Sequence, residues 1–567
     1  MAVGSRDLSR TPPARTSGSA RRISGLLLAA LVACACGGSS STPATPLPAN
    51  TSGWWRDQVG YEIFVRSFAD SGTDGIGDLK GLTAKLVDLN DGAPAASTNS
   101  LGVDFIWLMP IFPSPSYHGY DVTDYRAVNP DYGTLADFDA LITEARARHL
   151  RVILDMTLNH SSSQHPWFVD SRSGATAARR DWYVWSPTDP GWTAQNGSHP
   201  FRYWSPGNYF YGYFGADMPD LNLRNAAVEA ELVDTMKFWL ARGVSGFRLD
   251  AVRYFVENGG AGLMDQGETH AFIQRVRAAL QGQYPEALLV AEAWADPEIS
   301  STYYGAGNEA QLAFSFGLND AMVSASQSGY ASWLNPMVDR FAAALDPKDR
   351  GFEAPFLSNH DGAAGRGVGR LGWNSPQARV AAATLMAMPG TPFLYYGDEI
   401  GMAGQTTNDD SGVRTPFRWT TSATGTYGFT VGTTTTWFEN HTGALPAEPA
   451  GVELQTQRAD PASLYNLFRN LIKLRHAQPP LARGSAARLT PSGGGNGAFA
   501  QLRTWQGKRV LFVANYAATA SGAFTIGAGG TPVVLLQEGL AGAPTGTAAT
   551  VTVPGLAASS FAFLSLD

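Results

Sequence analysis

Residues 244–250 read Val-Ser-Gly-Phe-Arg-Leu-Asp, and this segment indicates the type of unit from which the fold is built. Apolar residues at helical spacing precede it and stop at Gly243, a residue type that commonly ends a helix. The stretch itself is a short apolar run typical of a buried strand, yet it carries Arg248 and ends in Asp250. A helix followed directly by a buried strand with charged residues at its end predicts a parallel β/α unit.

The same alternation of strand and helix repeats along the chain in both directions. The predicted strands are 59–65, 103–109, 151–156, 244–249, 287–291, 311–316, 353–358 and 391–396. Leucines at helical spacing follow the first strand, and Thr134 with Asp137 can form a capping box for a helix after the second. The number of strands is the number that a closed parallel barrel needs.

Two stretches break this alternation and predict further domains in the 567-residue chain. Residues 159–222 are dense in Trp, Tyr, Gly and Pro and are too long for a structureless loop, so we expect an inserted subdomain. From 480 to 567 the helical spacing disappears, and short strand-like runs predict a β-sandwich. The predicted fold class is α/β: a (β/α)8 TIM barrel (54–158 and 223–479) with an inserted subdomain after strand 3 and a C-terminal all-β sandwich domain.

The N-terminus has the pattern of a targeting segment. An arginine pair precedes an apolar run over 23–33, and residues 31–34 (LVAC) resemble a bacterial lipobox. We expect residues 1–36 to be a signal peptide with cleavage before Cys34, lipidation of the Cys34 thiol, and a flexible linker over 37–53. The protein would then be an extracytoplasmic bacterial lipoprotein, in the periplasm or at the cell surface, that contacts the membrane only through its anchor. An ordinary signal peptide with two incidental cysteines is the alternative.

Composition limits the possible partners. Both cysteines lie before residue 37, so the folded part has no disulfide and no thiol chemistry. The net charge of −8 does not indicate a basic surface, which argues against a nucleic-acid partner. The 15 Trp residues suit sugar faces as a group, although any single one is more often a core residue. We expect a monomer.

Polar residues occur where four of the predicted strands end, and barrels of this type place catalytic groups at these ends. The strings are 155–160 (DMTLNH), 246–250 (GFRLD), 291–294 (AEAW) and 358–361 (SNHD). One such string is weak evidence, because a strand-end Asp is often a helix cap. Together they bring carboxylates, histidines and an arginine to one rim, which predicts an active site.

These four strings resemble the four sequence signatures of the α-amylase family of glycoside hydrolases. Flanking strings fit as well: 102–115 (GVDFIWLMPIFPSP), 218–222 (MPDLN) and 390–402 (GTPFLYYGDEIGM). The resemblance implies that Asp250 attacks the anomeric carbon, that Glu292 is the acid/base, and that Asp361 steadies sugar hydroxyls and helps keep Glu292 protonated. It covers residues 54 to 480 closely.

The chemistry of a retaining glycosidase explains why such carboxyls are needed. The nucleophile and the acid/base must lie about 5 to 5.5 Å apart, and the charge of one raises the pKa of the other. Arg248 stands two residues before Asp250 and therefore faces the same side of the strand, where it would keep Asp250 ionised. A structural Arg–Asp ion pair is the alternative, but it does not explain Glu292 and Asp361.

The resemblance also implies substrate contacts along the rim, where a Tyr ring can stack under a pyranose and His can hold hydroxyls. The predicted substrate-binding residues are His118, Tyr120, Asp121, Asp155, His160, Arg248, His360 and Arg414. In α-glucosidases and trehalose-forming members of the family, an Arg and an Asp can pair to close the site behind a terminal glucose. Arg414 and Asp121 are the residues that could form this pair here.

A loop after the first strand predicts a structural Ca²⁺. Carboxylates at alternating positions with glycines between them can wrap a hard cation, and the loop over 70–78 (DSGTDGIGD) resembles the family's metal site. The implied ligands are Asp70, Asp74, Asp78 and the Ile76 carbonyl, and Gly72 stands where the family often has Asn. A second family site would use Asn159 and a carbonyl at Tyr254. An acidic turn without metal is the alternative.

The sequence favours a retaining hydrolase of α-1,4-glucosidic bonds in starch-type glucans or maltooligosaccharides. The string 413–419 (VRTPFRW) resembles α-glucosidases and trehalose-forming relatives. An exo-acting α-glucosidase or oligo-1,6-glucosidase, or a glucosyltransferase of the trehalose-forming type, is therefore the alternative. A non-catalytic amylase-like binding protein is a further alternative, but such proteins typically lack the carboxyl trio.

Overall fold

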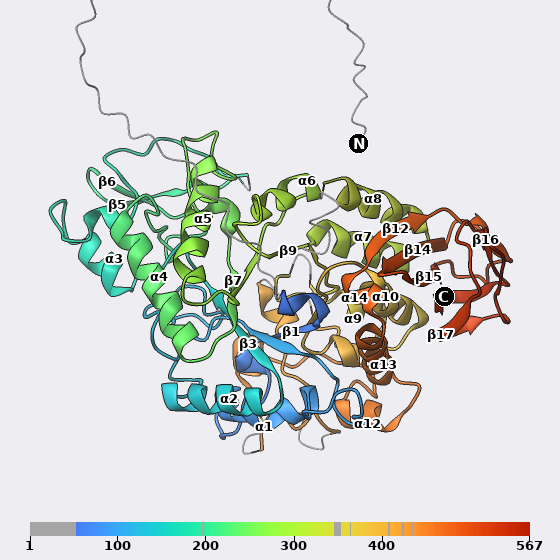
Figure 1. Cartoon of the computed structure of the whole chain (residues 1–567). Helices are drawn as coiled ribbons and strands as arrows, with labels where there is room; N and C mark the ends of the chain where they lie inside the picture. The colour runs from blue at the N-terminus through green and yellow to red at the C-terminus, as the bar shows by residue number, and fades with distance from the viewer. Residues whose placement is uncertain are drawn as a thin grey trace, which may run out of the picture. The chain divides into compact units, whose positions relative to one another are not determined.

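The computed structural model describes residues 53–566, except 196, 345–352, 363–364, 406–408, 422–424 and 432–434. The predicted signal peptide, Cys34 and the linker up to residue 52 lie outside the described residues. In the described part, eight parallel strands form one sheet with the order β10-β9-β8-β7-β3-β2-β1-β11 (Figure 1). They are β1 (Gly60–Ile63), β2 (Phe105–Leu108), β3 (Arg151–Met156), β7 (Gly246–Leu249), β8 (Leu288–Ala291), β9 (Leu312–Phe314), β10 (Glu353–Ala354) and β11 (Phe393–Tyr395).

The two edges of this sheet meet, which closes it into a barrel. The Phe393 N–H at the start of β11 donates to the Pro355 carbonyl at 2.9 Å, and Phe356 forms a parallel bridge with Phe393. Closure leaves the sheet almost no free edge, as expected for a barrel of this kind. The predicted barrel is confirmed.

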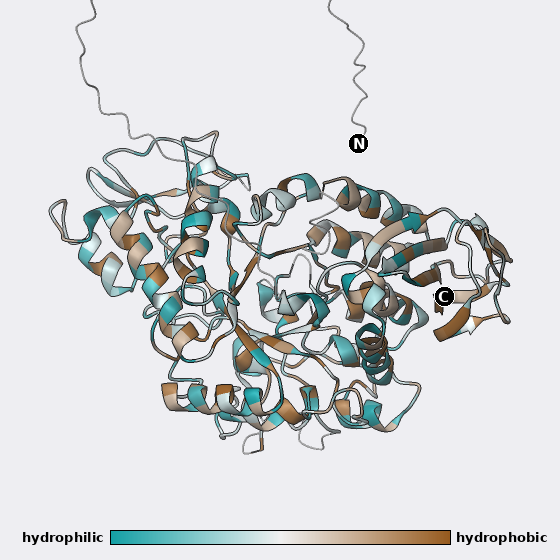
Figure 2. Cartoon of the chain, viewed as in Figure 1, coloured by the Kyte–Doolittle hydropathy of each residue, from teal (hydrophilic) through white to brown (hydrophobic). Residues whose placement is uncertain are grey.

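Helices alternate with the strands and cover the outside of the barrel. The longer ones are α1 (Leu79–Leu89), α2 (Leu135–Ala147), α4 (Ala226–Ala241), α5 (Gly267–Gln281), α7 (Phe316–Ser328), α8 (Leu334–Ala344), α10 (Pro376–Ala387) and α13 (Leu464–Ala477). The shorter ones are α6 (Pro297–Ser300), α9 (Gly367–Arg370), α11 (Trp437–Thr442), α12 (Leu454–Ala459) and α14 (Pro479–Arg483). The predicted capping box of Thr134 and Asp137 starts α2. Polar and apolar residues mix along α1, α2 and α4, as expected for helices that bury one face (Figure 2).

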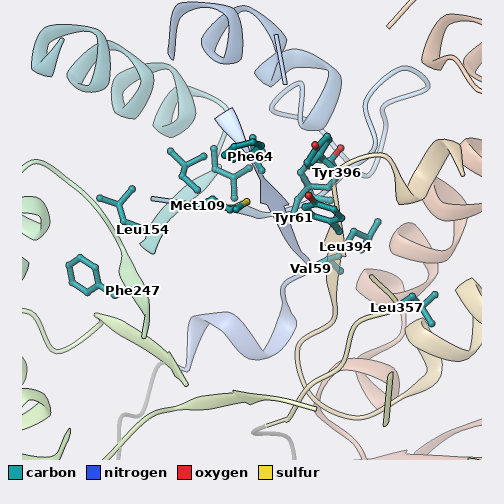
Figure 3. Packing of buried hydrophobic residues seen from close by; sticks show 14 of the residues in the cluster. Val59, Tyr61, Phe64, Met109, Leu154, Phe247, Leu357, Leu394 and Tyr396 are labelled. Carbon is teal, nitrogen blue, oxygen red and sulfur yellow. The ribbon is translucent and has the colours of Figure 1, made fainter. Parts of the chain in front are cut away.

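Alternate residues of the barrel strands belong to two different apolar clusters. Tyr61, Leu154 and Phe247 pack in a large cluster that also contains residues of the surrounding helices (Figure 3). A separate cluster fills the barrel interior: Trp55, Phe105, Trp107, Ile153, Leu288, Val290, Leu312, Phe314, Phe316, Ala354, Phe356 and Phe393. Because side chains alternate along a strand, Arg248 lies on the inward face between the outward Phe247 and Leu249. Inward-facing residues at the carboxyl ends of the strands therefore point to the mouth of the barrel.

Seven of the eight predicted strands are shorter than predicted, and only β3 has the predicted bounds. The strand predicted over 353–358 ends at Ala354, because Pro355 has no N–H for a strand ladder and the chain continues only through isolated bridges. The strand predicted over 311–316 ends at Phe314, and Phe316 already begins α7. The predicted bounds of these seven strands were therefore wrong, while the order of the elements was right.

The chain between β3 and α4 holds a small unit with its own sheet. It contains α3 (Pro166–Ser171) and the antiparallel strands β4 (Trp185–Ser186), β5 (Phe201–Ser205) and β6 (Asn208–Tyr211), in the order β4-β6-β5. Aromatic residues such as Phe201 and Tyr211 form its core. An antiparallel bridge between His160 and Asp220 ties the end of this insertion back to the residues that follow β3.

The C-terminal region consists of two antiparallel sheets around a shared core, as predicted for a sandwich. One sheet has β12 (Ser485–Leu489), β14 (Ala498–Trp505), β15 (Lys508–Asn515), β20 (Leu556–Ser565) and β17 (Val533–Leu540). The other has β13 (Ser492–Gly493), β16 (Phe524–Ile526), β19 (Val551–Val553) and β18 (Thr545–Gly546). Across the described residues, none of the helices has the length and apolar character that a bilayer span requires.

Candidate active site

A cavity of about 730 Å³ lies at the carboxyl ends of the barrel strands. Its lining includes all three predicted catalytic carboxyls and five of the predicted substrate-binding residues, which are His118, Tyr120, His160, His360 and Arg414. The rest of the lining is Tyr117, Gln195, Phe214, Met218, Ala251, Arg253, Tyr254, Trp294, Asp409 and Asp410. Residues as far apart in sequence as Tyr117 and Arg414 thus meet in one cavity, as the strand-end pattern predicted.

The Arg248 guanidinium joins the predicted nucleophile and acid/base. Its Nη1 lies 2.6 Å from Asp250 Oδ1, and its Nη2 lies 3.0 Å from Glu292 Oε2. Nη1 also lies 2.8 Å from Oδ1 of Asp155, which is fully buried on β3. Beyond β7, Ala251 adopts a left-handed backbone (φ 53°), and its N–H donates to Glu292 Oε2 at 2.7 Å. Three carboxyls are therefore gathered on one cation and one backbone donor.

Burial shifts the pKa values of the three catalytic carboxyls. It raises the pKa of Glu292 to about 7, with Arg248 opposing the shift and Asp250 adding to it. Burial likewise raises the pKa of Asp361 to about 7, with a further rise from Glu292. Burial also raises the pKa of Asp250, but Arg248 opposes this through both its charge and its hydrogen bond. Because Asp250 has the closest contact with the guanidinium, we assign the charge to Asp250 and the proton to Glu292.

Histidine and tyrosine side chains form the wall around these carboxyls. The Tyr120 ring stacks on His360, with 5.6 Å between centroids and 16° between planes. The Nδ1 of His118 accepts from the Tyr120 N–H at 3.1 Å. The Nε2 of His160 is buried and has no hydrogen-bond partner in the described part of the chain, and burial lowers the pKa of His160 to about 4. A neutral imidazole with an unpaired nitrogen at the cavity wall suits a sugar hydroxyl.

Arg414 has partners other than the one that the sequence suggested. Its Nη2 lies 3.5 Å from Asp361 Oδ1 and 3.3 Å from Asp410 Oδ2, and its Nε donates to the His360 carbonyl at 2.9 Å. Asp121 instead accepts from the Ser114 hydroxyl at 2.5 Å and from the Ser116 hydroxyl. Ion pairs among the described residues do not join Arg414 to Asp121. The hydroxyls of the nearby serines donate hydrogen bonds to the Asp121 carboxylate, while Asp410, four residues before Arg414, forms an ion pair with the guanidinium.

The predicted metal loop is held by its own backbone. Asp70 accepts from the N–H groups of Gly72 and Gly75, at 2.5 and 3.0 Å, and Asp74 accepts from the Ile76 N–H at 3.0 Å. Asp78 is the N-cap of α1 and accepts from the Gly81 N–H at 2.7 Å. Within the described ranges, no group of three or more His, Cys, Asp or Glu side chains is arranged to hold a metal. A carboxylate keeps further lone pairs after one hydrogen bond, so the loop offers hard oxygen donors but not a closed cage.

Asn159, the predicted ligand of a second metal, shows a different pattern. Its Nδ2 donates to Asp220 Oδ2 at 2.9 Å, while its Oδ1 is buried without a partner among the described residues. Burial raises the pKa of Asp220 to about 8. An unpaired amide oxygen of this kind is a free donor for a hard cation, although the neighbouring Asp220 is disposed to be neutral.

Several cavity residues were not among the predicted site residues. Trp294 stacks on Phe316 with 4.3 Å between centroids and is 38% exposed, so one ring face is open. Its position two residues after Glu292 was a usable signal. Gln195 and Phe214 come from the insertion, and Asp410 lies well beyond β11. No spacing rule could place these three at the site, because only the folded loops bring them there.

Comparison with known proteins agrees with this geometry. Residues 62–484 match the family described as the catalytic domain of alpha amylase. "Alpha-amylase 3" of Dictyoglomus thermophilum is 35% identical over 437 residues, which cover 77% of this chain and 80% of that protein. "Trehalose synthase/amylase TreS" of Mycobacterium tuberculosis is 32% identical over 504 residues, covering 80% and 79%. An alpha-amylase from H. orenii has a crystal structure with a TM-score of 0.76 and 33% identity, covering 90% of this chain and 99% of that one. The chain belongs to the α-amylase family of glycoside hydrolases.

Proposed function

We propose that this enzyme is a retaining hydrolase of α-1,4-glucosidic bonds in starch-type glucans or maltooligosaccharides. The observation that carries the proposal is the shared contact of Asp250 and Glu292 with Arg248 at the wall of one cavity. Two carboxyls on one guanidinium lie close enough to act on a single sugar ring. Their environments also differ, because Asp250 has the closest cation and Glu292 keeps a proton up to a pH of about 7.

The reaction then follows in two steps. Asp250 attacks the anomeric carbon and forms a covalent glycosyl-enzyme, while Glu292 gives its proton to the leaving oxygen. Glu292, now ionised, takes a proton from water, which attacks the same carbon and releases the sugar with its original configuration. Asp361 lines the same cavity and is the group that would hold hydroxyls of the reacting ring.

Open aromatic faces support a substrate of several sugar units. Trp294 is 38% exposed and Phe214 is 40% exposed, and both line the cavity. Flat rings of this kind pack against sugar faces, so they could bind units beyond the reacting one. Phe214 belongs to the insertion, which gives that unit a part in substrate binding.

The buried position of Arg414 favours a second candidate. It is 3% exposed, reaches Asp361 and Asp410, and lies beside the Tyr117 ring. A cationic wall next to a catalytic carboxyl could block further sugar units on that side, as an exo-acting α-glucosidase or glucosyltransferase requires. The similarity to a trehalose synthase/amylase agrees with this alternative. We do not favour a non-catalytic binding protein, because the full carboxyl trio lines the cavity.

Product analysis separates these candidates. Starch, maltoheptaose, maltose, isomaltose and sucrose would each be incubated with the enzyme, and the products followed by chromatography and by NMR of the anomeric protons. A mixture of oligosaccharides from starch and maltoheptaose, with retained configuration, supports the first proposal. Release of glucose alone, or formation of trehalose from maltose, would support the second. Inversion at the anomeric carbon would exclude the double-displacement mechanism.

We further propose that the protein is anchored outside the cytoplasm through Cys34, and that the loop over 70–78 binds a structural Ca²⁺. The lipobox-like string at 31–34 supports the anchor, and the hard oxygen donors of the loop support the cation. Replacing Cys34 with Ser should move the protein from the membrane fraction to the soluble extracytoplasmic fraction. An unchanged membrane fraction in the Cys34→Ser variant would contradict the anchor.

A further inference from the structure

The barrel interior contains a carboxyl group that the reaction above does not use. Glu62 lies on β1 and is 2% exposed. Its neighbours Tyr61 and Ile63 pack towards the helices, so Glu62 points inwards, to the side on which the apolar cluster around Trp107 lies. A buried carboxyl without hydrogen bonds is costly, so Glu62 must have a partner that compensates its burial.

That partner is a histidine of the active site. Glu62 Oε1 lies 2.5 Å from Nδ1 of His360, which is 1% exposed and lines the cavity. The other ring nitrogen, Nε2, lies 2.6 Å from the Tyr120 hydroxyl and 3.3 Å from Asp361 Oδ1. Glu62 therefore contacts the far side of an imidazole whose near side faces the catalytic carboxyls.

The neighbouring hydrogen bonds decide where the imidazole proton lies. The Tyr120 hydroxyl also lies 3.0 Å from Asp155 Oδ2. Arg248 donates to both oxygens of Asp155, at 2.8 and 3.1 Å, so these oxygens are acceptors. The single hydroxyl proton of Tyr120 goes to Asp155, and Tyr120 must therefore accept from a proton on His360 Nε2.

Burial and the neighbouring charges decide whether the other ring nitrogen of His360, Nδ1, carries a proton. Burial lowers the pKa of His360 well below its usual range, and Arg414 and Arg248 lower it further. Burial raises the pKa of Glu62 well above its usual range; Arg248 and Arg414 oppose this, while Asp361 and Asp155 add to it. The imidazole is then neutral with Nε2 protonated, so Nδ1 is an acceptor and the Glu62 carboxyl must supply the proton between them.

We infer that Glu62 is a positioning residue for His360: as a neutral carboxylic acid it donates to Nδ1 and fixes the tautomer whose Nε2–H faces Tyr120 and Asp361. This tautomer directs the Nε2 proton to the Tyr120 hydroxyl, 2.6 Å away, on the side of the ring where Asp361 Oδ1 lies 3.3 Å from the same nitrogen. The effect on turnover rests on the proposed function, whereas the state of the imidazole does not.

Three variants test the inference. Glu62→Gln has the same shape and can still donate to Nδ1 without any charge, whereas Glu62→Met removes the donor. Glu399→Met is the matched control, because Glu399 is also a buried carboxyl, accepts from the Tyr61 hydroxyl at 2.7 Å, and lies apart from the cavity lining. For each protein, kcat and KM on a maltooligosaccharide, the melting temperature, and the ¹⁵N imidazole spectrum would be measured. His360→Gln assigns the His360 signals.

Glu62→Gln should keep kcat/KM within about fivefold of wild type and keep the Nε2–H tautomer, since its amide still donates to Nδ1. Glu62→Met should lower kcat/KM by about 10- to 100-fold and show mixed tautomers, whereas Glu399→Met should lower only the melting temperature. The inference is wrong if Glu62→Gln is as impaired as Glu62→Met, or if wild-type His360 is protonated on Nδ1. If Glu62→Met does not fold, Glu62→Gln and the spectra decide. If the wild type hydrolyses no glucan, the proposed function fails while the spectra still test Glu62.

Discussion

At the scale of single residues, Arg248 explains why three neighbouring carboxyls can differ in protonation state. It contacts Asp155, Asp250 and Glu292 in a buried setting with one positive charge. Three ionised carboxylates around one cation would leave uncompensated negative charge out of water, which is costly. At least one carboxyl must therefore stay protonated near neutral pH, and this is the condition that an acid/base needs.

Replacing either member of the proposed catalytic pair should lower the rate of hydrolysis severely and keep the fold. We expect Glu292→Gln to lower kcat by about 10²- to 10⁴-fold, the usual contribution of a general acid, and Asp250→Asn to lose at least as much. Initial rates on maltoheptaose, with circular dichroism for the fold, measure this. The matched controls are Glu298→Gln and Asp339→Asn, whose carboxyls are exposed and pair with Arg340 and Arg488. Near-normal turnover in either catalytic variant would disprove its assigned role.

The pH dependence of kcat/KM follows from the raised pKa of Glu292. Burial raises that pKa to about 7, so the acid form persists to higher pH than for an ordinary Glu. Above about 7 the proton is lost, the leaving oxygen is no longer protonated, and kcat/KM should fall about tenfold per pH unit. The apparent value belongs to the coupled carboxyls as a group. A kcat/KM that still rises at pH 9, in protein shown to be folded there, would contradict the assignment.

At the scale of elements, the strict alternation of inward and outward side chains along short strands orients the catalytic residues. β7 has only the residues Gly246–Leu249, yet its inward positions continue from Arg248 to Asp250. Likewise, Leu288 and Val290 of β8 face the interior, and Glu292 is the next residue on that side. A shift of one residue in either strand would turn the catalytic group towards the helices, so register within the barrel is a condition for activity.

The loop over 70–78 gives a prediction about metal. If Ca²⁺ binds the folded loop, excess chelator should lower the melting temperature and added Ca²⁺ should restore it, because a ligand that binds only the folded state stabilises it. Asp74→Asn should remove the effect of chelator. Asp91→Asn is the matched control, since Asp91 accepts from the N–H two residues on, as Asp74 does, but lies outside the loop. Identical melting curves with and without chelator would mean that the loop is held by its backbone alone.

At the scale of the whole molecule, the barrel and the C-terminal sheets share one apolar cluster. Phe499, Phe512, Phe561 and Phe563 are at most 1% exposed and belong to the same cluster as the barrel helices. The Tyr516 hydroxyl lies 2.7 Å from the Thr384 hydroxyl of α10, and Arg503 donates to the Ala387 carbonyl at 2.7 Å. Neither side of this contact could face water without exposing buried rings and buried polar groups.

The shared cluster predicts cooperative unfolding of both parts. Calorimetry of the protein should show one main transition, and a chain that ends at residue 479 should be insoluble or unfolded, because the removed sheets cover apolar surface of the barrel. Two well-separated transitions, or a soluble and active barrel without residues 480–567, would show that the C-terminal sheets do not stabilise the barrel.

The sequence predicted the barrel because its information is local. Apolar runs, helical spacing and the capping box at Thr134 each depend on neighbours within a few positions, and the structure reproduces their order. Strand ends were less predictable, as at Pro355, where one missing N–H shortens β10. The strand-end rule alone brought Asp250, Glu292 and Asp361 to one rim, because parallel strands share their carboxyl end.

Local sequence patterns predicted the alternation of strands and helices and the rim to which the polar strand ends belong, and the resemblance of the strand-end strings predicted the family. The contacts between side chains could be assigned only in the folded chain: Arg414 contacts Asp361 and Asp410 instead of Asp121, and Glu62 contacts His360 from β1. The physical reason is range. Periodicity is fixed by bonds between neighbours, whereas a hydrogen bond between residues 298 positions apart depends on barrel closure and on the packing of every layer between them.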